Sequence, residues 1–118
     1  MAVLRIVANL AAADPAAAQD FYGRILGLDT VMDHGWIVTY AAPGGVTMTP
    51  QLGIASEGGS GTPVPDLSIE VDDLDDVLAA MRAAGHAIDY GPASEPWGVR
   101  RFFVRDPLGR LVNILSHS

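Results

Sequence analysis

The chain has 118 residues, 49% of them hydrophobic, and carries a formal net charge of −7 with no lysine and no cysteine. This length suits one compact domain, and the acidic balance argues against nonspecific nucleic-acid binding, which needs cationic side chains to replace phosphate counterions. The absence of cysteine excludes disulfides, thiolate metal sites and cysteine nucleophiles. No segment approaches the roughly 20 apolar residues of a membrane span, so we expect a cytoplasmic protein with no membrane partner.

The first half of the chain predicts a strand, a helix and three further strands. Leu4–Ala12 is a short apolar run typical of a strand, and the Asp14-Pro15 pair that follows it is a strong helix start. A helix is expected over residues 16–26, where apolar side chains recur at helical spacing. The next strands are expected at 30–32, at 36–42 and within 46–56, and Pro50 leaves the register of the last strand open.

The second half repeats this order. Asp66–Val71 predicts a strand, and Asp72-Asp73 opens a helix over residues 74–84. Further strands are expected at 87–90, 99–105 and 110–115, with a proline-containing loop at 91–98. The chain therefore reads as one domain of two βαβββ modules, about 1–57 and about 66–118, joined by a glycine-rich linker at about 58–65. We predict an α+β fold in which the two modules form a curved mixed β-sheet cleft with the helices on the outer face.

Three motifs carry a family resemblance. They are Asp20-Phe21-Tyr22 with Leu26-Gly27-Leu28, Glu70-Val71-Asp72-Asp73, and Trp97–Phe102 running into Asp106-Pro107-Leu108-Gly109. Together they span residues 9–115 and resemble the vicinal oxygen chelate superfamily, which includes glyoxalase I, bleomycin-resistance proteins, extradiol dioxygenases and fosfomycin-resistance enzymes. Most of these motif residues have structural roles, so we expect Phe21 and Tyr22 to pack between helix and sheet. For Trp97, packing under its loop and a wall of the cleft remain equal alternatives.

The resemblance also implies where a metal would bind. Enzymes of that superfamily hold a divalent metal such as Zn, Ni, Mn or Fe through His, Glu or Gln on four strands. Counting from the motifs, these positions fall on Val7, Asp66, Asn113 and one of Thr47, Thr49 or Gln51. Valine cannot bind a metal and asparagine is a poor ligand, while His34, His86 and His117 are expected at the surface. We therefore predict no metal cofactor.

Strand alternation predicts which side chains line the cleft. If Leu67, Ile69, Phe102 and Ile114 face the helix, their neighbours face the cleft. The predicted ligand-binding residues are Val7, Asn9, Asp66, Ser68, Glu70, Trp97, Arg101, Phe103, Leu111 and Asn113. Buried carboxylates need partners, and Arg101 is one candidate for Asp66 or Glu70. Alternatively, the negative charge awaits a cationic or hydrogen-bond-donating ligand, or one of these two carboxylates acts as a general base.

These expectations favour a metal-independent protein that binds or sequesters a small aromatic or cationic molecule, as the resemblance to the bleomycin-resistance branch implies. The alternative is an enzyme, either a metal-dependent lyase, isomerase or dioxygenase with an atypical site or a metal-free acid–base catalyst that uses Glu70 or Asp66. The resemblance further implies a homodimer, in which the two chains either keep or exchange their modules.

Overall fold

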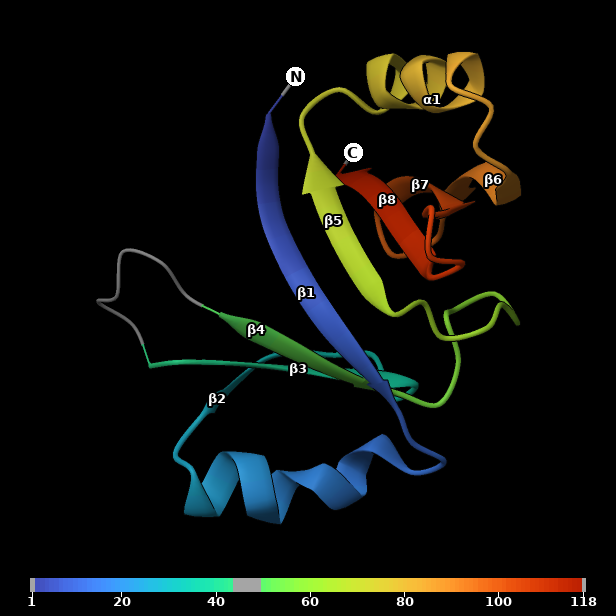
Figure 1. The fold of residues 1–118 in the computed structure, drawn as a ribbon. Helices are drawn as coiled ribbons and strands as arrows, with labels where there is room; N and C mark the ends of the chain where they lie inside the picture. The colour runs from blue at the N-terminus through green and yellow to red at the C-terminus, as the bar shows by residue number, and fades with distance from the viewer. Residues whose placement is uncertain (1, 44–49, 118) are drawn as a thin grey trace. The chain divides into compact units, whose positions relative to one another are not determined.

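Eight strands, one α-helix and two shorter helical segments form the part of the chain that the computed structural model describes, residues 2–43 and 50–117 (Figure 1). The residues group into two compact units, one of residues 7–64 and one of residues 1–6 with 65–118. The order of elements confirms the predicted α+β class with a mixed sheet and a repeated βαβββ pattern. None of the helices within the described ranges is long and apolar enough to cross a membrane.

In the unit of residues 7–64, the end of β1 (Val3–Ala11) pairs in parallel with β4 (Gln51–Ala55). Strand β4 pairs antiparallel with β3 (Ile37–Ala41), which pairs antiparallel with β2 (Asp29–Asp33). The parallel pairing places Gln51 opposite Val7, which resolves the register that Pro50 had left open. Thr47 and Thr49, the two alternatives to Gln51 at this implied metal position, lie outside the described residues.

The first helical region differs from the regular helix expected over residues 16–26. Residues Pro15–Ala18 form a 3₁₀ turn and Gln19–Ile25 a π-helix, in which the Leu26 N–H donates to the Phe21 carbonyl at 3.1 Å. The Asp14 side chain makes no capping hydrogen bond. Tyr22 packs against the core of this unit, but Phe21 is 56% exposed, so its predicted place in the core is wrong. Consecutive helical residues point in different directions, and only one of the two can face the sheet.

The glycine-rich stretch at about 58–65 is an ordered turn rather than an extended connection. The Gly58 N–H donates to the Thr62 carbonyl at 2.7 Å, and the Thr62 hydroxyl donates to the Gly59 carbonyl at 2.7 Å. The Glu57 carboxylate also accepts from the Gly61 N–H at 2.9 Å. These bonds close the loop within the unit of residues 7–64.

In the other unit, β5 (Leu67–Val71) pairs in parallel with β8 (Leu111–His117), and β8 pairs antiparallel with β7 (Val99–Arg105). Strand β6 (Ile88–Glu95) pairs antiparallel with β7 and is longer than expected, since most of the predicted loop at 91–98 belongs to it. The pairing continues past Gly91 and Pro92 because the register shifts between Tyr90 and Ala93.

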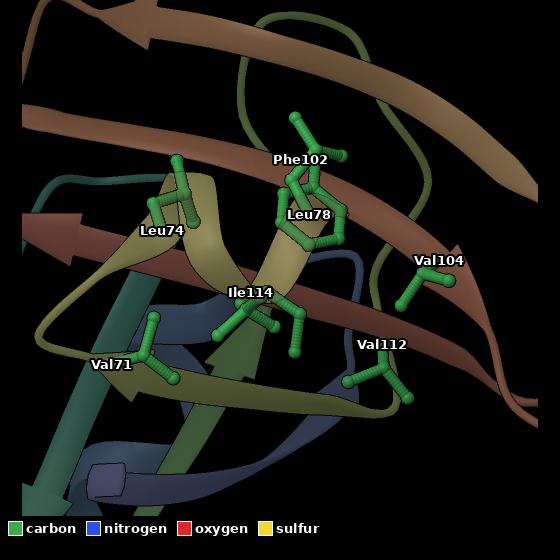
Figure 2. Close-up of a cluster of buried hydrophobic side chains, with 8 residues drawn as sticks. Val71, Leu74, Leu78, Phe102, Val104, Val112 and Ile114 are labelled. Atoms are coloured by element: carbon green, nitrogen blue, oxygen red, sulfur yellow. The ribbon is translucent and has the colours of Figure 1, made fainter. Parts of the chain in front are cut away.

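Helix α1 (Leu74–Ala83) covers one face of this sheet. Its N-cap Asp73 accepts a hydrogen bond from the Asp76 N–H at 3.0 Å, which confirms the start predicted from Asp72-Asp73. Figure 2 shows the buried cluster beneath the helix, where strand and helix side chains meet: Val71, Leu74, Leu78, Phe102, Val104, Val112 and Ile114. Leu67 and Ile69 pack against the same cluster, so the predicted helix-facing residues of β5, β7 and β8 are confirmed.

Candidate functional site

The candidate site is the opposite face of the sheet in the unit of residues 1–6 and 65–118, which we call the α1-distal face. Side chains alternate along a strand, so the residues between those that pack on α1 point to this face. They are Ser68 and Glu70 of β5, Arg101 and Phe103 of β7, and Leu111, Asn113 and Leu115 of β8. Cross-strand pairing places Phe103 opposite Asn113, and Asn113 opposite Ser68. The structure therefore brings together these predicted site residues.

A buried ion pair lies on the α1-distal face. The Arg101 Nη2 atom is 3.7 Å from Glu95 Oε2, and both side chains are only 3% exposed. Glu95 also accepts a hydrogen bond from the Tyr90 hydroxyl at 2.6 Å, and this bond is the main reason why the pKa of Tyr90 is raised. Burial lowers the pKa of Arg101, while the Glu95 carboxylate opposes that change. A guanidinium ionises so far above neutral pH that Arg101 stays a cation.

The pairing of β6 with β7 places Glu95 on the face of Arg101, and a register shift in β6 adds Tyr90 to that face. Tyr90 lies opposite Phe103 and Ala93 opposite Arg101, so three steps along β6 match two steps along β7. The extra residue places Tyr90 and Glu95 on the same face, although they are five positions apart and an odd spacing normally puts two strand residues on opposite faces. Gly91 makes the bulge feasible because its φ is +82° and a Cβ would lie 2.6 Å from the Arg101 carbonyl oxygen.

Three aromatic rings surround the Arg101 guanidinium. Its central carbon lies 4.8 Å from the ring centroid of Phe103, 5.0 Å from that of Trp97 and 5.4 Å from that of Tyr90. Cation–π attraction of this kind is stronger where water is excluded. Trp97 thus stacks on Arg101 while remaining half-exposed, so its ring also presents surface that Arg101 does not cover.

The carboxylates of Asp66 and Glu70 do not pair with Arg101. Glu70 binds Arg5 Nε at 3.1 Å and His117 Nδ1 at 2.8 Å, whereas Asp66 is exposed and accepts a hydrogen bond from the Leu111 N–H at 3.2 Å. The expected partnership of Arg101 with these residues is therefore wrong, because the pairing of β6 with β7 brings Glu95 to it instead. The one carboxylate that β5 contributes to this face, Glu70, therefore already has partners.

Asn113 and Ser68 form the neutral polar part of the α1-distal face. The Asn113 Nδ2 group donates to Ser68 Oγ at 3.1 Å, across the parallel pairing of β8 and β5. Asn113 is only 7% exposed, and its Oδ1 atom is buried with no hydrogen-bond partner among residues 2–43 and 50–117. This oxygen is a hydrogen-bond acceptor that the described chain leaves unused.

Two predicted site residues belong to the other unit. Val7 is buried on β1 opposite Gln51, and Asn9 lies opposite Gly53. A Cβ at residue 53 would lie 2.2 Å from Asn9 Oδ1, so glycine leaves room there for the Asn9 side chain. The structure shows these two residues beside β4, within the unit of residues 7–64.

The residues at the four implied metal positions do not fit a metal. Val7 has no donor atom, Asn113 offers only a neutral amide oxygen, and the Asp66 carboxylate accepts a hydrogen bond from a backbone N–H. Gln51 remains as a neutral ligand, and a stable site needs several good donors that converge. Over the ranges 2–43 and 50–117, no three His, Asp or Glu side chains are grouped so that they could hold a metal ion.

Sequence reasoning missed the partners that organise this face. Glu95 and Tyr90 were placed in or before a loop, and neither Arg5 nor His117 was connected with Glu70. The one available signal was Gly91 between Tyr90 and Glu95, since an isolated glycine in a strand pattern suggests a bulge. Pairings between strands far apart in sequence leave no comparable signal.

Comparisons with known proteins agree on the fold. The family described as "Glyoxalase/Bleomycin resistance protein/Dioxygenase superfamily" matches residues 4–114. No curated protein matches the chain. Among solved structures, a superfamily member from Vibrio splendidus 12B01 is similar at 20% identity with a TM-score of 0.57, covering 98% of this chain and 99% of its own.

Two further solved structures carry functional names. One, titled an NAD-dependent benzaldehyde dehydrogenase from Legionella pneumophila, has 16% identity and a TM-score of 0.75, with 97% of this chain and 100% of its own covered. The other is methylmalonyl-CoA epimerase from Mycobacterium tuberculosis, with 21% identity, a TM-score of 0.63, and coverage of 98% and 87%. At such low identity these structures share the fold with this chain and nothing more specific.

Proposed function

We propose that this chain, which belongs to the Glyoxalase/Bleomycin resistance protein/Dioxygenase superfamily, binds a small aromatic molecule on its α1-distal face without a metal cofactor. The family is broad in chemistry, so membership alone assigns no activity. The proposal is supported by the side chains that replace the family's metal ligands and by those that surround them.

One observation carries the proposal: the charges on the α1-distal face already have partners, whereas the Trp97 ring is partly exposed. Arg101 is paired with Glu95, and Glu70 with Arg5 and His117. A cationic ligand would therefore compete with an existing cation for each carboxylate, which offsets much of its attraction. Trp97 presents a half-exposed aromatic ring, and stacked or edge-to-face aromatic pairs add to the free energy of apolar burial. The structure thus favours the aromatic over the cationic ligand.

A thermal-shift screen tests the function. The purified protein is treated with a chelator and then heated with neutral aromatic compounds, cationic aromatic compounds, or Zn, Ni, Mn and Fe salts. Ligands that bind the native state raise its melting temperature. We expect neutral aromatic compounds to raise it and Trp97→Ala to abolish this effect. Trp36→Ala, a tryptophan of the other unit stacked on His34, is the matched control and should retain it.

The second candidate function is a metal-dependent lyase, isomerase or dioxygenase, as the family permits. It requires a metal that co-purifies in stoichiometric amount and is lost in Asp66→Asn. That result, together with metal-dependent stabilisation and no response to aromatic compounds, would refute the proposed function. A metal-free acid–base role for Glu70 is less favoured because its carboxylate is already bound by Arg5 and His117.

A homodimer is part of the proposal. Leu4 and Ile6 alternate along β1 within the unit of residues 1–6 and 65–118 and are 60% and 56% exposed, which leaves a large apolar surface on this strand. A second copy of the chain would cover this surface.

We also place the protein in the cytoplasm on the ground of its cysteine-free composition, and cell fractionation tests that location.

A further inference from the structure

We infer that Asn113 selects the ligand: its Oδ1 atom accepts a hydrogen bond from an N–H or O–H group carried by the aromatic molecule. This inference rests on the proposed function and specifies its ligand class, an aromatic compound with a neutral hydrogen-bond donor. Asn113 is only 7% exposed, and its Oδ1 has no partner in the described part of the chain.

The local geometry directs the unused acceptor. With the amide donating to Ser68 from Nδ2, its carbonyl oxygen is the group left over, and the orientation is maintained by that 3.1 Å bond. The backbone of Asn113 is committed to the ladders with β5 and β7. Only the side-chain oxygen is therefore free to bond a group from outside the described chain.

The neighbours of Asn113 explain why an aromatic donor fits. Phe103 lies directly opposite on β7, so a ring that bonds Oδ1 through its edge substituent would lie beside an aromatic side chain. The side chain of Asn113 bonds the neutral Ser68, while Arg101 and Glu95 of the same face form an ion pair with each other. A neutral acceptor in such surroundings favours a neutral donor over an ion, which would be desolvated without compensation.

Burial of the oxygen determines how strongly it discriminates. Buried polar groups in native proteins almost always have partners, and one that stays unsatisfied is costly. A ligand without a donor leaves Oδ1 without a hydrogen bond, whereas a ligand with a donor forms that bond in a buried place where water does not compete for it. We expect a preference of about tenfold to a hundredfold for the donor-bearing ligand. Reaching a shielded oxygen requires covering side chains to move, so the affinity for small probes will be modest.

The test compares β-naphthol with its methyl ether, which differ in the O–H donor. Isotope-labelled full-length protein is titrated with each compound, and nuclear magnetic resonance follows the Asn113 side-chain amide and the Trp97 indole. We expect β-naphthol to bind about tenfold more tightly than the ether and to shift the Asn113 amide signals. Asn113→Leu, similar in volume but without an acceptor, should bind both compounds equally. Ser116→Ala, on the same strand but on the other face, should keep the preference.

Each outcome decides the inference. Equal affinities in the unaltered protein, a preference for the ether, or a preference that survives Asn113→Leu would each overturn the role of Asn113. In those cases shifts at Trp97 would leave the proposed function standing. No shifts at either residue with either compound would overturn both. If Asn113→Leu does not fold, as judged by circular dichroism, the comparison of the two compounds on the unaltered protein still decides.

Discussion

Removing the Glu95 carboxylate should destabilise the fold strongly, because it leaves Arg101 as an uncompensated buried cation. The two side chains are 3% exposed and 3.7 Å apart, so solvent screens them little. Breaking one partner of such a pair costs about 3–5 kcal/mol. The three rings around the guanidinium persist and retain about 1–2 kcal/mol of cation–π attraction, which places the expected loss for Glu95→Ala near the lower limit, about 3 kcal/mol.

Urea denaturation and calorimetry measure this loss. For a domain of this size, about 3 kcal/mol corresponds to a fall in melting temperature of roughly 12 °C. Glu95→Gln keeps a hydrogen-bond acceptor for the Tyr90 hydroxyl and should lose less. The double variant Glu95→Ala with Arg101→Met removes the cation as well, and should recover most of the stability. A loss below about 1 kcal/mol for Glu95→Ala, or a double variant as unstable as the single one, would refute the reasoning.

Four other predictions follow from the same structure. The pKa of the Tyr90 phenol should lie above its ordinary value of 10.0 and fall in Glu95→Gln, as measured by the ultraviolet absorbance of tyrosinate. Because folding raises that pKa, the protonated Tyr90 phenol stabilises the folded state fully below its unfolded pKa, and this stabilisation is lost as pH rises through the folded pKa. An unchanged titration in Glu95→Gln would contradict the assigned cause. Asp73→Ala should cost about 1 kcal/mol by removing the cap of α1, while Asp73→Asn should cost much less; equal losses would show that the cap is not responsible. Gly91→Ala should be more destabilising than Gly98→Ala, because both positions have positive φ but only at Gly91 would the new Cβ meet a carbonyl oxygen, at 2.6 Å. Sedimentation at micromolar concentration should show a dimer that Ile6→Glu dissociates; a monomer before the substitution would dismiss the β1 interface.

Local pattern was sufficient wherever one face of an element meets an apolar core. The alternation in β5, β7 and β8 correctly identified the side chains beneath α1, and Asp73 correctly marked where that helix begins. Both signals depend on residues near one another in sequence, because helical and strand periods are set by the backbone. The same reasoning failed for Phe21, since a π-helix changes which residues of a turn face the sheet.

By itself, the sequence determined the repeated βαβββ architecture and the family. Only the tertiary structure decided which charges meet. The regular pairing of β6 with β7 next to their turn puts Glu95 on the face of Arg101, so Glu95 instead of Asp66 or Glu70 becomes its partner, and the register shift near Gly91 brings Tyr90 to the same face. The physical reason is that a slip of one residue reverses every side chain of a strand, while sequence spacing contains no record of which strand will lie alongside.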